Sequence, residues 1–386
     1  MRGLQRDGTA LLCLIGFAST ICVGAFAPLL PEIGRAEALA DWQLGLLAGS
    51  FGFARMAADL PVGAAATRHL GRVLLAAPIT LLAGMLLLAT AGPLPVLVLG
   101  RLLTGLAQTL VMVGSLTAIL REPPGPRASI RLNTLEFSGM LGVLGGLTLV
   151  GLLPERWHWN TTLLVATTPI AVSLAATLLL VRQLPRSAEP PAPSGRGAAD
   201  GSSSPRRSGA PPPIVRLMFA LGVIMALAWS SVAQIVVPLR GTRHFGLDRG
   251  GISGLLSLAQ LVDLVALLPV GWLADRVGRP PVLVAVAAVL GLGTWAVALG
   301  TLPLFAVGCA LFGFGMAGWM LPLGVIREHT DPARLGWRTG IYRLGGDGAI
   351  FLGPLICGLL GEAHTSRFIV LVGVGAFAVA VGLLRR

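Results

Sequence analysis

Seven charged side chains stand inside long apolar runs of this 386-residue sequence. A charge near the centre of a lipid bilayer costs at least about 2.5–3.5 kcal/mol, so such groups usually pair with one another or line a wet cavity. The chemistry open to these residue types is ion pairing and the binding and release of protons. They are Arg55, Asp59, Arg101, Glu136, Asp263, Arg343 and Asp347.

Two arginine–aspartate pairs have the spacing of about one helical turn. Arg55 precedes Asp59 by four residues, and Arg343 precedes Asp347 by four. On a helix these partners lie about 6 Å apart along the axis. Each pair can be satisfied within its own helix, or it can exchange partners with a second helix. The spacing alone leaves both arrangements open.

The composition indicates a membrane protein. Hydrophobic residues make up 54% of the chain and charged residues 12%, against about 25% charged residues in soluble domains. Apolar runs of about 18–25 residues recur along the chain, long enough to cross a bilayer as helices and too long for barrel strands. We therefore predict an all-α polytopic fold with twelve transmembrane helices. The runs are 9–30, 43–66, 73–92, 95–119, 131–153, 161–181, 214–238, 251–273, 281–300, 303–326, 340–360 and 366–384.

The positive charge orients the helices rather than binding nucleic acid. If the N-terminus is cytoplasmic, twenty of the 29 basic residues fall in inner segments, six in outer loops and three within spans. This bias predicts that both termini are cytoplasmic. Every basic residue is arginine, which suggests GC-rich codons and hence the inner membrane of a bacterium. We expect a monomer in the lipid bilayer, with no nucleic-acid partner.

The sequence divides into two similar halves. Residues 182–213 are rich in Pro, Gly, Ser and Ala and predict a flexible cytoplasmic linker between a six-helix half at 1–181 and another at 214–386. PVGAAATRHLGRV at 61–73 aligns with PVGWLADRVGRPP at 269–281. Internal repeats of this kind are typical of secondary transporters, whose sites form between two halves.

The repeated loop resembles a motif of the major facilitator superfamily. The loop has the pattern G-x-x-x-D-R-x-G-R at 271–279, and in the first half Thr67 replaces the aspartate. R-x-x-x-G at 101–105, the W-x-W pair at 157–159 and Asp347 before Gly353-Pro354 also resemble the family. The pattern is nearest to the twelve-helix bacterial drug/proton antiporters, although the acid of their first helix is absent.

The resemblance implies that these loops latch the two halves on the cytoplasmic side. Alternatively, the loop charges only anchor the topology at the headgroups. The residues of this cytoplasmic gate are Gly63, Arg68, Gly71, Arg72, Gly271, Asp275, Arg276, Gly278 and Arg279.

In the family, helix two pairs with helix eleven across the boundary between halves, and helix five with helix eight. The resemblance therefore places Asp59 opposite Arg343 and Arg55 opposite Asp347, as a ladder that closes in one state and parts in another. Small residues at 45, 49, 52 and 63 lie near the same stripe and permit close packing.

Glu136 and Asp263 are predicted to face each other across the second boundary. Two acids within about 6 Å repel each other, which favours a carboxyl that binds and releases a proton. Together with Asp347 they are our proton-coupling candidates, although either could instead neutralise Arg101 or Arg131.

In the family, a central cavity is lined by helices one, four, seven and ten. We expect it to be mostly apolar and to suit a small amphipathic organic molecule. The candidate substrate-binding residues are Arg55, Arg101, Thr104, Gln108, Ser230, Gln234 and Trp319.

These features predict a proton-coupled secondary transporter, with antiport and efflux slightly favoured. The alternatives are proton-coupled uptake of an organic anion or nutrient, in which Arg55 and Arg101 hold a carboxylate, and a non-transporting sensor. The five histidines and four cysteines form no metal or nucleophile constellation. We expect no enzyme activity, catalytic residue, metal or cofactor.

Overall fold

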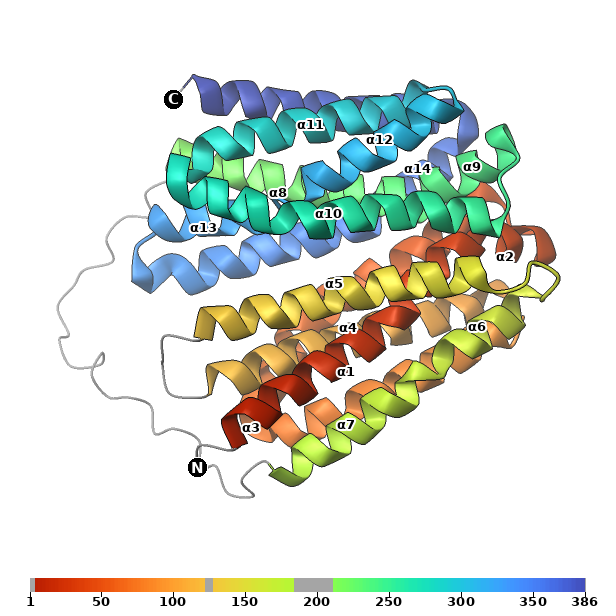
Figure 1. Ribbon diagram of the computed structural model, residues 1–386, viewed down its shortest axis with the longest axis horizontal. Coiled ribbons are helices and arrows are strands. Elements are labelled where there is room, and N and C mark those ends of the chain that lie inside the picture. Colours follow the sequence, from red (N-terminus) through yellow and green to blue (C-terminus); the bar gives the residue numbers. More distant parts are fainter. Residues whose placement is uncertain (1–3, 122–127, 184–210, 386) are drawn as a thin grey trace.

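The computed structural model describes residues 4–121, 128–183 and 211–385, and every regular element in these ranges is helical. The elements form two bundles stacked on each other (Figure 1). The first bundle comprises α1 (Leu4–Phe26), the 3-10 turn η1 (Ala27–Leu29), α2 (Leu30–Ala36), α3 (Asp41–Ala89), α4 (Leu94–Leu120), α5 (Ala128–Leu152), α6 (Trp159–Thr167) and α7 (Pro169–Gln183).

The second bundle begins after residue 212. It comprises α8 (Pro213–Ser231), the π-helical turn η2 (Val232–Val236), α9 (Val237–Phe245), α10 (Arg249–Val277), α11 (Arg279–Leu299), α12 (Leu302–Met316), α13 (Leu321–Glu328) and α14 (Pro332–Leu384). The start of α1 and the end of α14 lie at the same end of the molecule, at the left of Figure 1. We call this the terminal end and the other the opposite end.

The element α3 folds back on itself. Gly105 of α4 packs against Phe51, and Gly100 packs against Gly84. A straight helix would separate residues 51 and 84 by about 50 Å, whereas residues 100 and 105 lie within about 8 Å along α4. The non-helical dihedrals of His69 (φ −133°, ψ 50°) mark the reversal.

The element α14 reverses in the same way. Gly345 and Gly375 contact the adjacent residues Val223 and Ile224 of α8, although about 45 Å would separate them on a straight helix. The reversal falls at Gly361, whose φ of 65° belongs to the left-handed region that glycine adopts without a steric penalty.

Ten helical segments of the described chain are long and apolar enough to cross a membrane. The twelve predicted spans fall within these ten apart from at most three residues at an end, because α3 and α14 each contain two of the runs. The folding back of α3 and α14 is the arrangement that twelve crossings require, and the count of twelve remains a prediction. Most of the predicted linker lies outside the described residues. Large apolar side chains such as Leu60 and Leu152, each 79% exposed, cover the outer surface as lipid-facing helices require.

The bundles meet along a seam in which α3 packs on α14 and α5 on α10. Towards the opposite end, the helices of the seam approach to backbone contact: a methyl group added at Gly45 would lie 2.5 Å from the Pro354 carbonyl oxygen. Towards the terminal end, a methyl group at Gly63 or Gly340 would meet nothing within 4 Å. The seam is therefore tight at the opposite end and loose at the terminal end.

Candidate functional site

A ladder of two ion pairs crosses the seam between α3 and α14. Arg55 Nη2 lies 2.9 Å from Asp347 Oδ1, and Arg343 Nη2 lies 3.1 Å from Asp59 Oδ2. Arg343 Nε also donates to Asp59 Oδ2 at 3.2 Å. The two helices are antiparallel here, so residues four apart on one helix meet residues four apart on the other. The pairs are formed between helices, as the sequence analysis expected from the family pairing.

Glu136 of α5 and Asp263 of α10 also face the seam. The negative charge of Glu136 repels that of Asp263, and the positive charges of Arg55 and Arg343 attract that of Glu136. Neither acid forms an ion pair in the described part of the chain. Asp347 and Asp59 pair with the two guanidiniums of the ladder, so Glu136 and Asp263 have no cation of their own among the described residues. An excess carboxyl in an apolar seam is a natural site for a proton.

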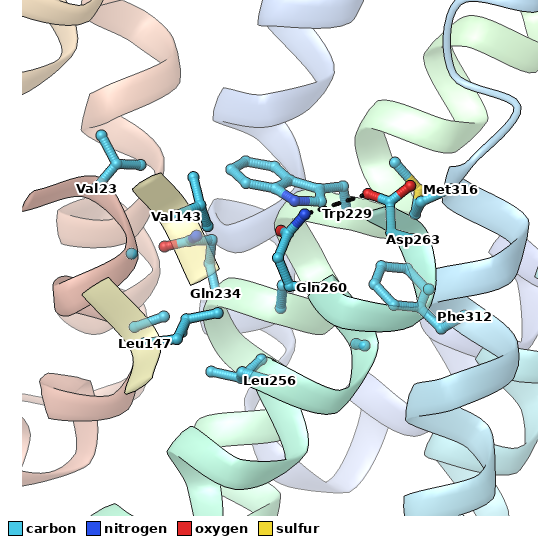
Figure 2. A pocket seen from close by; sticks show the side chains of 15 residues that line it. Val23, Val143, Leu147, Trp229, Gln234, Leu256, Gln260, Asp263, Phe312 and Met316 are labelled. Atoms are coloured by element: carbon cyan, nitrogen blue, oxygen red, sulfur yellow. Dashed lines mark hydrogen bonds between the residues drawn. The ribbon is translucent and has the colours of Figure 1, made fainter. Parts of the chain in front are cut away.

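A small cavity opens at the seam beside Asp263 (Figure 2). It encloses about 40 Å³, far less than the 300–1,000 Å³ typical of ligand sites, so an organic solute needs the surrounding helices to move apart. Its walls come from both bundles. They are formed by Val23, Gly24, Ala27, Val143, Leu147, Trp229, Ala233, Gln234, Leu256, Ala259, Gln260, Asp263, Phe312, Gly313 and Met316.

Three polar side chains stand in this apolar wall. Gln260 Nε2 donates to Asp263 Oδ2 at 3.4 Å, as the dashed line in Figure 2 shows. Asp263 Oδ1 and Gln234 Oε1 are buried and have no hydrogen-bond partner within the described residues. Because an unpaired buried polar atom costs free energy, these two atoms are the places where a proton, a solute or water would bind.

The local backbone presents these groups. Gln234 lies in η2, the π-helical turn between α8 and α9. Turns of this kind are frequent at functional sites, since the wider turn redirects side chains. On the facing wall, α12 ends at Met316, and the chain is not helical again until Leu321. Interrupted helices near the middle of a membrane often mark solute sites in transporters.

The predicted residues of α4 lie apart from this cavity. The guanidinium of Arg101 is buried between aromatic rings, with Cζ 3.7 Å from the centroid of Phe26 and 4.9 Å from that of Phe51. Its Nε has no partner in the described chain. Thr104 donates to the Arg101 carbonyl, and Gln108 is buried. The wall expected from helix four is instead supplied by α5 and α10, because α4 packs closely against α3.

Two other predicted residues lie near the cavity without lining it. Ser230 Oγ donates to the carbonyls of Ala349 and Leu227, at 3.2 and 3.3 Å. Trp319 packs with Trp229 against a buried cluster that spans both bundles. Of the seven predicted substrate-binding residues, Gln234 alone lines the described cavity.

The predicted cytoplasmic gate residues make their described contacts within their own bundle. Arg279 pairs with Glu328 at 2.8 Å, and Arg276 lies over the Trp272 ring with Cζ 4.1 Å from its centroid. Gly278 has a φ of 95° and allows the tight turn between α10 and α11.

In the first bundle, the gate side chains Arg68 and Arg72 are exposed. Gly63 and Gly271 have no neighbour within 4 Å of an added methyl group, and Gly71 and Asp275 lie at the same end of the molecule. The gating role of all these residues remains a prediction.

Two further ion pairs close the opposite end, and no sequence pattern predicted them. Arg249 at the start of α10 binds Glu32 of α2, with Nε 2.7 Å from Oε1. Arg243 of α9 binds Asp41 of α3 at 2.6 Å. Both arginines lie in a predicted loop outside the apolar runs, where a charge is ordinarily solvated and needs no partner.

Comparison with known proteins identifies the class of this protein. The family model of the Major Facilitator Superfamily matches residues 12–239 and 217–386, so the chain belongs to this superfamily. It is a multi-pass membrane transporter rather than an enzyme. A gallate transporter from Pseudomonas putida is 31% identical over 323 residues, which cover 74% of this chain and 70% of that protein.

Solved structures share the fold at low sequence identity. A POT family transporter in complex with a thioalcohol-conjugated peptide has a TM-score of 0.78 at 13% identity and covers 98% of this chain and 95% of its own. The nucleoside transporter NupG has a TM-score of 0.71 at 14% identity and covers 98% of both chains.

Proposed function

We propose that this protein moves a small organic acid, of the aromatic carboxylate class, across the membrane together with protons. The observation that carries the proposal is the cavity at the seam, where the buried atoms Asp263 Oδ1 and Gln234 Oε1 lack partners. The substrate class is supported by the 31% identical relative named a gallate transporter. Apolar walls that include Trp229 and Phe312 suit the faces of an aromatic ring.

The position of Asp263 favours symport over uncoupled movement of the anion. An ionised Asp263 would repel a carboxylate in the same cavity. A protonated Asp263 would instead donate a hydrogen bond to it, and the unpartnered Gln234 Oε1 would accept from a hydroxyl group of the substrate. Substrate and proton would therefore bind together. Glu136 and Asp347 lie along the same seam and are candidates to pass the proton on.

The ladder would then act as the part of the seam that changes during alternating access. Asp59, Arg343, Arg55 and Asp347 pair in the state described here. In a state with the terminal end closed, the gate loops would meet, and Arg55 or Arg101 could be freed to hold a carboxylate. We place the protein in a bacterial inner membrane as a monomer, with its termini in the cytoplasm.

We propose uptake, although the antiporter-like sequence pattern slightly favoured efflux. Symport favours uptake, because a substrate that binds together with a proton moves in the direction of the proton gradient, which we take to be inward. With cytoplasmic termini, the loose terminal end faces inward, so the structure would be inward-facing.

Uptake of radiolabelled gallate into proteoliposomes tests the proposal. An inward proton gradient should drive accumulation in the parent protein. Asp263→Asn should reduce this uptake to the level of protein-free liposomes, because the amide cannot release a proton. Glu136→Gln should also impair the gradient-driven component. Glu37→Gln, an acid that does not line the cavity, serves as the matched control.

Two results would contradict the proposal. If uptake by the parent protein does not depend on the proton gradient, transport is not coupled to protons. If gradient-driven uptake is unchanged in Asp263→Asn, Asp263 takes no part in the coupling. If gallate accumulates only under an outward proton gradient, gallate and protons move in opposite directions, and the protein is an antiporter.

A further inference from the structure

The opposite end of the seam is held by one buried arginine. The Arg249 side chain, 1% exposed, binds three segments of the first bundle. Nε and Nη2 bind the two carboxylate oxygens of Glu32, Nη1 donates to Thr162 Oγ1 at 2.6 Å, and Nη2 also donates to the Trp157 carbonyl at 2.9 Å. Since α10 belongs to the second bundle, the two bundles cannot separate here without breaking all of these bonds.

Two carboxyls from opposite bundles meet beside this arginine. Asp248 caps α10, and its Oδ1 accepts from the Gly251 amide at 2.6 Å. Glu155 lies in the loop between α5 and α6. A methyl group at Gly250 would lie 3.5 Å from Asp248 Oδ1 and 3.8 Å from Glu155 Oε1, which places both carboxyls around the same point.

The surroundings of the two carboxyls favour proton binding by Glu155 over proton binding by Asp248. A hydrogen bond with Asp248, followed by the negative charge of Asp248, raises the pKa of Glu155. The backbone amide of Gly251 and the hydrogen bond with Glu155 lower the pKa of Asp248. Of the other charges near Glu155, Glu32 acts in the same direction as Asp248, and Arg249 opposes them.

We propose that Glu155, Asp248, Arg249 and Glu32 form a proton-sensitive latch that holds the two bundles together at the opposite end. The Arg249–Glu32 pair supplies the attachment, and the carboxyl pair makes it depend on pH. This inference rests on the proposed alternating-access function, and it adds a second proton-binding group, distant from Asp263, that controls closure rather than substrate binding.

The sign of the pH effect on the latch follows from comparing the closed state with the state in which the bundles have parted. When they part, Glu155 loses Asp248, and its pKa returns towards the ordinary value of a glutamate. The closed state therefore binds the proton more tightly than the open state. Stabilisation of the closed state is complete below the ordinary pKa and is lost as pH rises through the raised pKa of Glu155. If this end faces outward, external acid closes the latch, which suits a proton-driven importer.

Access to Ser253 measures whether the latch is closed. This side chain is 2% exposed on α10, and its Cβ would lie 2.7 Å from a methyl group at Gly151 of the other bundle. We would label Ser253→Cys in nanodiscs with a polar maleimide at about pH 5 and about pH 8. Peptide mass spectrometry reports residue 253 separately from the native cysteines. Ala36→Cys, at an exposed position of the same end, corrects for the pH dependence of thiol reactivity.

The corrected labelling rate of Ser253→Cys should be higher at the higher pH than at the lower pH, because deprotonation of Glu155 weakens the closed state. Adding Glu155→Gln should keep labelling slow at both values, because the amide donates as the protonated acid does. Adding Arg249→Gln should make it fast at both. Arg249→Lys, which keeps the charge without the forked geometry, should be intermediate.

The matched control is Arg156→Gln, which removes an exposed arginine of the same loop and should leave the pH profile unchanged. A parent rate that does not depend on pH, or a pH dependence that survives Glu155→Gln, would overturn the latch. Labelling requires no substrate, so these results are independent of whether gallate is transported or Asp263 carries a proton.

Discussion

Asp59 and Arg343 form the rung of the ladder nearest the terminal end, and exchanging their charges tests whether they act as partners. Asp59→Arg or Arg343→Asp alone places like charges together and should cost about 1–2 kcal/mol, between the values for exposed and buried pairs. The double exchange restores opposite charges and should recover most of that loss. Thermal unfolding in detergent and gallate uptake measure both effects.

The control for this exchange is Arg216→Asp, a charge reversal at an exposed position of α8. It should change stability by no more than about 0.5 kcal/mol. A double variant of Asp59 and Arg343 that is no more stable than either single variant would show that the two side chains do not depend on each other.

At the level of residues, the sequence predicted the ladder and missed the latch for one physical reason. Arg55 and Asp347 lie in apolar runs, where any charge is costly and needs a partner. Arg249 and Glu32 lie at helix ends, where charges are ordinarily solvated, and their burial depends on how the two bundles meet. Tertiary packing of this kind leaves no signal in composition or spacing.

At the level of elements, the contact of α3 with α14 depends on the absence of side chains. A methyl group at Gly49 would lie 2.5 Å from the Phe351 carbonyl oxygen. Gly49→Ala should therefore destabilise the closed opposite end by about 1–3 kcal/mol, the usual cost of overpacking. Thermal unfolding should detect this loss, and labelling of Ser253→Cys should become faster.

The matched control for Gly49→Ala is Gly63→Ala on the same element. Gly63 has no neighbour within 4 Å of an added methyl group, so the substitution should leave both readouts nearly unchanged. If Gly49→Ala behaves like Gly63→Ala, the tight packing at residue 49 is not what holds the opposite end together.

Hydropathy predicted where the elements run but not where they break. Apolar runs located the helical segments because a lipid core requires long helices. The π-helical turn at Val232–Val236 and the interruption between α12 and α13 lie inside such runs. Apart from Gln234, the composition there is apolar. The breaks, and with them the placement of Gln234, therefore follow from packing that the sequence pattern does not reveal.

At the level of the whole molecule, the seam changes character along its length. The opposite end is closed by Arg249–Glu32, Arg243–Asp41 and the glycine contacts of α3, and the terminal end is loose around Gly63. The ladder and the cavity beside Asp263 lie between these ends. This gradient is what a rocking movement of two bundles about a central site would produce.

A reversible cross-link would keep the opposite end closed and leave the helices of the terminal end free to move apart. The Cβ atoms of Gly151→Cys and Ser253→Cys would lie 2.7 Å apart across the bundles, so a small outward shift brings them to the roughly 3.5–4.5 Å that a disulfide needs. Oxidation of the double variant should abolish gallate uptake, and reduction should restore it, whereas both single variants should be insensitive to oxidant. Because the terminal end stays open, gallate should still raise the unfolding temperature of the oxidised protein. Uptake that continues at full rate in protein shown by mass to be cross-linked would mean that the opposite end need not open, and the alternating movement of the two bundles would have to be abandoned.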